Sequence, residues 1–235
     1  MKIKILTISV LIIMIITSII YSNSVNNNRF KYISVDNVVN DSLRMIEKDS
    51  IISYLKILSL VKDSVKINEI DLNKIENKLD EIKYVKKSNA FFGINSKLKI
   101  KIDERNPVIE INYLGAYLDD EGKVVPKSTL NNIKVIKVFG KIDPLKFIEV
   151  ADLGLRIAGD KFYKNHFNYV FSDSSELYIK PKMYNYTIEL GNLEMLEKKL
   201  NNYKFFYASK LNEKDLEKVR TINLKFDNQV IVEKK

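Results

Sequence analysis

Two short segments of the sequence hold side chains that could carry out acid–base or hydrolytic chemistry. Residues 119–121 are Asp-Asp-Glu, and clustered carboxylates can bind a divalent metal or cleave a glycosidic bond. Gly122 follows the run, however, and acidic residues directly before a glycine are typical of a turn. His166 precedes a Ser-Asp-Ser-Ser stretch at residues 172–175, which lacks the Gly-x-Ser-x-Gly motif of a nucleophile elbow. We therefore predict a turn at the first segment, and a surface or loop histidine followed by a polar loop at the second.

Other classes of chemistry lack the side chains they need. The 235 residues include no cysteine and one histidine, which excludes disulfides, cysteine nucleophiles and thiolate metal sites. The seven glycines form no phosphate-binding cluster. The formal net charge is +9, but the lysines are scattered among Ile, Asn and Asp, so we expect no nucleic-acid surface. The sequence thus predicts no catalytic residue, cofactor or metal, and favours a binding function.

The amino terminus is predicted to be a membrane anchor. Residues 5–21 carry no charge, and Lys2 and Lys4 precede them. The run would span about 26 Å as a helix, against about 30 Å for a hydrocarbon core. The positive-inside rule then predicts a single transmembrane helix within residues 1–24, a cytoplasmic amino terminus and an exported remainder. A cleaved signal peptide is the alternative, since small residues follow the apolar run.

The elements predicted beyond this segment form two α+β domains. Residues 25–105 read as strand, helix, helix, strand, strand, which would give a three-stranded sheet with both helices on its apolar face. Residues 106–235 read as a mixed β-domain with flanking helices. The predicted helices lie at 48–58, 71–82, 145–158 and 192–207, with Asp71 as an N-cap, and the predicted strands at 33–39, 84–92, 97–102, 108–112, 116–118, 134–139, 184–190 and 221–232.

Several segments together resemble one known family. DLNKIENKLDEIKYV at residues 71–85, followed by LKIKIDERNPV at residues 98–108, resembles the POTRA module of the FtsQ/DivIB cell-division family. Glu104, Arg105 and Pro107 match the Glu-Arg-x-Pro sequence at that family's domain junction.

The carboxyl-terminal half continues the resemblance. YLDDEGKVVP at residues 117–126 is similar to the family's Leu-Asp-x-x-Gly hairpin. TINLKFDNQVIV at residues 221–232 resembles its closing strands most closely, with Asn223 and Lys225 in place of the usual Asp and Arg. Residues 142–180 match the family only in their general pattern and not in specific motifs.

The resemblance implies a non-enzymatic, single-pass protein of the divisome. It would sit in the inner membrane at the division septum with its two domains in the periplasm. Its β-domain would bind the FtsB/FtsL pair by strand addition and help to regulate septal peptidoglycan synthesis, while its POTRA module would bind other divisome components. We expect the strand at 184–190 to border the binding edge and Lys225 to steer an acidic partner. The expected partner-binding residues are Thr221, Ile222, Asn223, Leu224, Lys225, Phe226, Val230 and Val232.

Two other functions remain open from the sequence. A POTRA-containing adaptor in envelope assembly or secretion would share the first domain, but envelope-assembly proteins carry a barrel or several modules. A membrane-tethered cell-wall hydrolase would need a cleft with paired carboxylates or a metal. Localisation at midcell would distinguish a division protein from an adaptor, and clearing of peptidoglycan would indicate a hydrolase.

Overall fold

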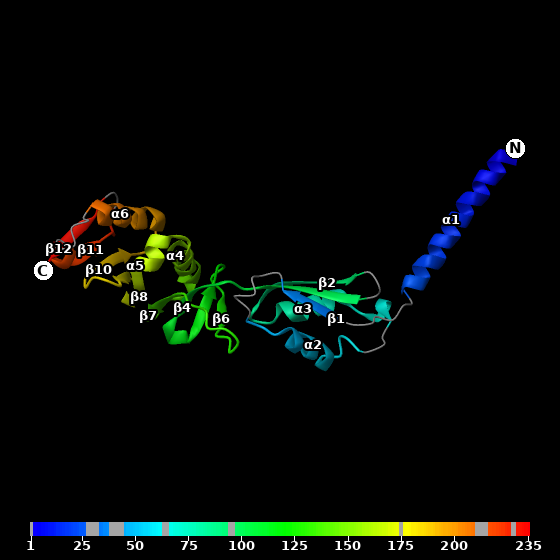
Figure 1. Cartoon of the computed structure of the whole chain (residues 1–235), viewed down its shortest axis with the longest axis horizontal. Helices are drawn as coiled ribbons and strands as arrows, with labels where there is room; N and C mark the ends of the chain where they lie inside the picture. The colour runs from blue at the N-terminus through cyan, green and yellow to red at the C-terminus, as the bar shows by residue number, and fades with distance from the viewer. Residues whose placement is uncertain are drawn as a thin grey trace. The chain divides into compact units, whose positions relative to one another are not determined.

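The structure, a computed structural model, divides the chain into two compact units (Figure 1). The amino-terminal unit is Met1–Glu104 and the carboxyl-terminal unit is Arg105–Lys235. The structure describes the backbone of residues 2–26, 33–37, 45–62, 66–93, 97–173, 176–209, 216–226 and 229–235, and the side chains of the same residues except 2–7, 25–26 and 35–37.

The prediction of a membrane-spanning anchor is contradicted by the structure. The first helix, α1 (Lys2–Asn26), covers the predicted segment, yet none of the helices in the described ranges has the length and apolar character needed to cross a membrane. The physical reason lies in the length of the apolar run, residues 5–21. At 1.5 Å per residue this run falls about 4 Å short of a hydrocarbon core of about 30 Å.

The amino-terminal unit has the predicted order of strand, helix, helix, strand, strand. Its sheet has the order β1-β3-β2, with β1 parallel and β2 antiparallel to β3. Residues 38–39, the end of the predicted first strand, lie outside the described residues. The elements are β1 (Ile33–Asn37), α2 (Lys48–Ile57), a 3-10 turn η2 (Ile67–Glu69), α3 (Leu72–Asp80), β2 (Val85–Gly93) and β3 (Lys97–Glu104).

In this unit α2 and α3 each bury an apolar face against the sheet. Ile51 and Leu55 of α2 and Ile75 and Leu79 of α3 join one core with the apolar side of β3. The predicted N-cap of α3 is confirmed, because Asp71 Oδ1 accepts a hydrogen bond from the Lys74 amide at 3.0 Å. Such a cap is worth about 1 kcal/mol.

The carboxyl-terminal unit is built on one nine-stranded sheet. Its order is β12-β11-β10-β9-β8-β7-β4-β5-β6. β4, β7 and β8 run parallel, as do β10 and β11, and the other neighbours are antiparallel. The strands are β4 (Pro107–Ile111), β5 (Ala116–Asp119), β6 (Val124–Pro126), β7 (Ile136–Phe139), β8 (Phe167–Asp173), β9 (Glu176–Pro181), β10 (Thr187–Gly191), β11 (Val219–Asn223) and β12 (Ile231–Lys234).

Helices pack on this sheet to complete a single core. Figure 1 shows α4 and α6 on the same side of the strands. Side chains of both helices join one buried cluster with the strands, including Val150 and Leu153 of α4 and Leu200 and Tyr203 of α6. The helical elements are 3-10 turns η3 (Asn112–Leu114) and η4 (Pro144–Lys146), and helices α4 (Phe147–Gly159), α5 (Lys161–His166) and α6 (Leu196–Ser209).

The acidic segment before Gly122 is a turn, as predicted. Asp119 is fully buried, and its Oδ1 accepts hydrogen bonds from the amides of Glu121 at 3.0 Å and Lys123 at 2.7 Å. Gly122 has a φ of 75°, the left-handed conformation that favours glycine. The first carboxylate therefore holds the turn together rather than facing a substrate.

Candidate partner-binding edge

One of the two edge strands of the nine-stranded sheet is β12. It pairs antiparallel with β11, with Ile222 opposite Val232 and Asn223 opposite Ile231. Within the described part of the chain no strand pairs with its other side. An edge of this kind presents unpaired backbone N–H and C=O groups that can accept a strand from another chain.

The direction of the free groups on β12 follows from one hydrogen bond. The Lys235 amide donates to the Lys218 carbonyl at 2.9 Å, so the backbone at position 235 faces β11. Along an antiparallel strand successive residues face opposite ways. Glu233 and Ile231 therefore also face β11, and the backbone groups of Val232 and Lys234 point away from the sheet.

β11 borders the edge and does not form it. It lies between β10 and β12, with Ile188 of β10 opposite Ile222. Residues 184–190 were predicted to border the binding edge, but the part that forms β10 pairs with β11 and lies one strand away from β12. Thr221, Ile222 and Asn223 have strand partners on both sides, so their backbone groups are not available to a guest strand.

The other predicted binding residues divide into packed and exposed ones. Leu224 is buried, and Val230 and Val232 are half-buried against the core of the unit. Phe226 is 52 % exposed, and Ile231 of β12, which the prediction did not include, is 43 % exposed. These two apolar side chains are available to a partner, whereas the packed ones stabilise the strands.

Lys225 has carboxylate partners within its own unit. Its Nζ lies 3.3 Å from Glu176 Oε2 and 3.4 Å from Glu189 Oε2. Burial alone would lower the pKa of Lys225, but the hydrogen bond to Glu176 and the charge of Glu189 outweigh it and raise this pKa. Lys225 therefore forms ion pairs with one residue of β9 and one of β10, and these two carboxylates already neutralise its charge.

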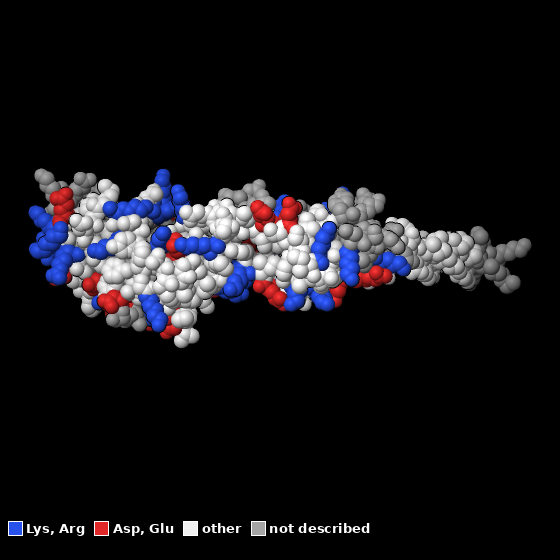
Figure 2. All heavy atoms as spheres, turned by 90° about the horizontal axis from the view of Figure 1, so that it is seen from below, with Lys and Arg blue, Asp and Glu red and all other residues white. Residues whose placement is uncertain are grey.

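Basic residues gather around the β12 edge instead. Figure 2 shows Lys and Arg atoms concentrated at the end of the molecule where Figure 1 places β11 and β12. Lys218, Arg220, Lys234 and Lys235 are all exposed there. Glu233 Oε1 lies 3.5 Å from Arg220 Nη1. The edge therefore keeps an excess of positive charge, which attracts an acidic segment.

The long edge of the amino-terminal sheet differs from β12 in being covered. The outward amide of Ala90 donates to Glu76 Oε1 at 2.7 Å, and that of Ser88 donates to Asp80 Oδ1 at 2.7 Å. Carboxylates four residues apart on a helix are about 6 Å apart, close to the about 6.8 Å between alternate strand residues. α3 thus occupies the outward amides of Ser88 and Ala90, which a guest strand would need along that stretch of β2.

The other edge strand of the nine-stranded sheet, β6, has three residues and ends in proline. Pro126 is opposite Ala116 of β5. A short strand that ends in proline offers few donors for another chain. Among the β2, β6 and β12 edges, β12 is therefore the best site for strand addition.

The residues predicted at the domain junction each contact the unit to which they belong. Glu104 is buried in the amino-terminal unit, where its Oε2 accepts a hydrogen bond from the Met45 amide at 2.7 Å. The next residue, Arg105, belongs to the other unit and places Nη1 2.6 Å from Asp119 Oδ2. Pro107 begins β4, where its missing N–H is tolerated.

The prediction for His166 was wrong, because its side chain is buried at the end of α5. Nε2 lies 2.6 Å from Tyr203 Oη, which is 2.7 Å from Tyr186 Oη. Burial, with a contribution from the charge of Lys182, lowers the pKa of His166 to about 4. Tyr186 precedes β10 and Tyr203 lies in α6, both far from His166 in sequence, so no local pattern indicated this cluster. It rigidifies the core and offers no nucleophile.

The chain was compared with known proteins. Within the described ranges, no group of three His, Asp or Glu side chains could hold a metal ion. A search of curated proteins found no match. Residues 106–232, more than half of the chain, match the family described as FtsQ/DivIB, C-terminal related. That family consists of non-enzymatic scaffolds of cell division and indicates the division septum as the place of action. The chain therefore belongs to the FtsQ/DivIB family and has a role in cell division.

Proposed function

We propose that the chain is a non-catalytic scaffold of the divisome whose carboxyl-terminal unit binds an FtsB/FtsL-type partner by adding the partner's strand to β12. The observation that carries the proposal is the position of β12 at the end of the sheet, with the backbone of Val232 and Lys234 directed outward. Backbone hydrogen bonds supply affinity in this mode, and alternate side chains supply specificity. Through this contact the protein would help to regulate septal peptidoglycan synthesis.

Charge and apolar contacts support the same partner class. Lys218, Lys234 and Lys235 favour an acidic segment, and exposed Phe226 and Ile231 offer apolar contacts beside the strand. The sequence predicted that Lys225 steers the acidic partner. We assign this role to the other lysines instead, because Lys225 is paired with Glu176 and Glu189. Steering by exposed charges weakens as salt screens them.

The test replaces Lys234 in the full chain. Lys234→Pro removes an outward N–H and leaves the β11 ladder intact, so affinity for an FtsB/FtsL-type segment should fall about ten-fold. Lys234→Gln is the matched control, because it removes the charge and keeps the amide. If the proline variant keeps its fold by circular dichroism and binds as tightly as the glutamine variant, strand addition at β12 is wrong. If the unmodified chain binds no such segment, the partner class is wrong.

We also propose that the amino-terminal unit is a POTRA module that contacts other divisome components. Its order of elements and its β1-β3-β2 sheet support this assignment. Because α3 covers the Ser88 and Ala90 amides, such contacts would use side-chain surfaces rather than added strands along that stretch. A fluorescent fusion should gather at midcell during constriction, and deletion of residues 33–104 should abolish this if the unit recruits the protein.

The alternative function, a cell-wall hydrolase, can be tested directly. The full chain should give no clearing in peptidoglycan zymography, since the acidic run at 119–121 forms a turn and His166 is buried. Clearing that persists in a purified sample would overturn the assignment as a scaffold.

A further inference from the structure

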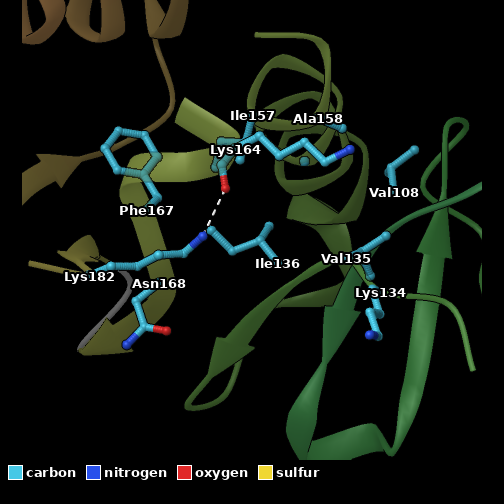
Figure 3. Close-up of a pocket in the computed structure, with 11 residues that line it drawn as sticks. Val108, Lys134, Val135, Ile136, Ile157, Ala158, Lys164, Phe167, Asn168 and Lys182 are labelled. Atoms are coloured by element: carbon cyan, nitrogen blue, oxygen red, sulfur yellow. Dashed lines mark hydrogen bonds between the residues drawn. The ribbon is translucent and has the colours of Figure 1, made fainter. Parts of the chain in front are cut away.

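A cavity of about 280 Å³ lies within the carboxyl-terminal unit, between α4 and the beginnings of β7 and β8 (Figure 3). Its apolar lining includes the buried side chains of Val108, Ile157 and Phe167. Gly154 lets α4 approach β4 closely at this point, because a Cβ there would lie 2.7 Å from the Val108 carbonyl oxygen. The cavity thus has an apolar floor set by close packing of a helix on a strand.

The polar part of the lining is strongly basic. Lys134, Lys164 and Lys182 all line the cavity, and no Asp or Glu is among its lining residues. None of these three lysines forms an ion pair with a carboxylate in the described part of the chain. Figure 3 shows the Lys164 side chain extending from α5 toward Val108 and Ala158, along the cavity.

Contacts with helix ends explain only one of these charges. Lys182 Nζ donates to the Lys164 carbonyl at 3.0 Å, near the end of α5, where a cation is favourable. The ammonium groups of Lys134 and Lys164 have no such contact among the described residues. The positive charge also reaches the neighbouring core, since Lys182 helps to depress the pKa of His166 after the larger effect of burial.

We propose that this cavity binds a small amphipathic carboxylate, with its apolar group against Val108, Ile157 and Phe167 and its charge beside Lys164. The volume is just below the usual range for drug-sized ligands, so the apolar group has a few carbons. Such a carboxylate occurs at a peptide's carboxyl terminus with an apolar last residue, or in a short-chain fatty acid. The site is independent of strand addition, because no residue of β11 or β12 lines the cavity.

The test is a methyl NMR titration of the full chain labelled at isoleucine. N-acetylleucine stands for a peptide terminus and hexanoate for a fatty acid, and the two corresponding amides are neutral controls. Ile136 and Ile157, which line the cavity, should shift and saturate with the better carboxylate, while Ile148, on the same helix as Ile157 and 69 % exposed, should not. The stronger of the two acids identifies the source of the ligand.

Charge-removing variants separate a built site from general attraction. Lys164→Gln should raise the dissociation constant about two- to five-fold, as expected for an exposed ion pair, and Lys134→Gln should raise it less, because Figure 3 shows that the Lys134 side chain points away from the Lys164 ammonium. Lys161→Gln is the matched control, because this exposed residue of α5 does not line the cavity. The proposal is overturned if the amides bind as well as the acids, if Lys161→Gln weakens binding equally, or if neither acid shifts Ile157 at about 10 mM.

Discussion

The Glu76 carboxylate of α3 accepts a hydrogen bond from the Ala90 amide of β2, with 2.7 Å between Oε1 and N. Together with the Asp80–Ser88 pair, this contact replaces a neighbouring strand with helix side chains. Charge-assisted bonds to backbone amides are shorter and stronger than neutral ones. The covered edge of the amino-terminal sheet thus protects the longest strand of that sheet from pairing with other chains.

Replacing Glu76 with alanine should therefore expose the β2 edge. The change leaves the Ala90 amide without its acceptor, so this unit should lose about 1–2 kcal/mol of stability. The Ala90 amide should exchange its hydrogen about ten-fold faster or more. Glu81→Ala is the control, because Glu81 pairs with Lys78 at the surface, and it should change neither quantity measurably. Unchanged exchange at Ala90 in Glu76→Ala would contradict this account.

Lys199 stabilises the segment between β10 and α6 from inside the fold. Its Nζ donates to the Leu190 carbonyl at 3.1 Å and to the Asn192 carbonyl and Oδ1 at 2.8 and 2.9 Å, although burial lowers the pKa of this lysine. Lys199→Met keeps the aliphatic length and leaves these acceptors unpaired. We expect a loss of about 2 kcal/mol in urea unfolding. Lys198→Met, at an exposed position of the same helix, should cost less than about 0.5 kcal/mol.

The stability of the carboxyl-terminal unit should depend on pH through His166. Its pKa is about 4 when folded, against about 6.5 for the free side chain, so the unfolded chain binds the proton more readily between these values. This contribution to stability is therefore complete above about pH 6.5 and is lost as the pH falls toward 4, by roughly 3 kcal/mol in all. Because the chain has one histidine, His166→Gln should remove this part of the dependence. Parallel stability curves for the two proteins would contradict it.

Gly140 is required for two reasons at once. Its φ is 83°, and a Cβ there would lie 2.4 Å from the Ser172 carbonyl oxygen. Gly140→Ala should therefore lower the melting temperature, with a loss of about 2 kcal/mol or more. Gly159 ends α4 without a positive φ, and a Cβ added there would meet nothing within 4 Å, so Gly159→Ala should be neutral or slightly stabilising. Equal effects of the two changes on stability would show that the fold tolerates a Cβ at Gly140.

Elements with their own local signals could be predicted from the sequence. The α3 segment has an N-cap at Asp71 and an apolar face, and β3 alternates buried and exposed residues along Lys97–Glu104. Both follow from spacing alone. The segment 160–181 forms α5, β8 and β9, whereas the sequence predicted a loop around His166 and at residues 172–175 and no helix or strand there. The signal was missed because α5 has only six residues and the aromatic side chains there pack with α6.

The candidate edge shows where sequence reasoning ends. Residues 221–232 could be read as strand, but which of its two strands is outermost depends on pairing with β10, more than 25 residues earlier in the chain. The charge partners of Lys225 are likewise remote in sequence, at Glu176 and Glu189. The membrane assignment failed for a simpler reason, since it relied on an apolar run shorter than the bilayer core.

The parallel pairing of β10 with β11 places α6 between the two strands along the chain. Parallel neighbours need a long crossover, here through α6, before the second strand can join. Among the residues that the structure describes, β11 is the strand that pairs with β12. If β12 is the docking strand as proposed, a copy whose β11 has not paired with β10 would lack the neighbour that holds this strand in place.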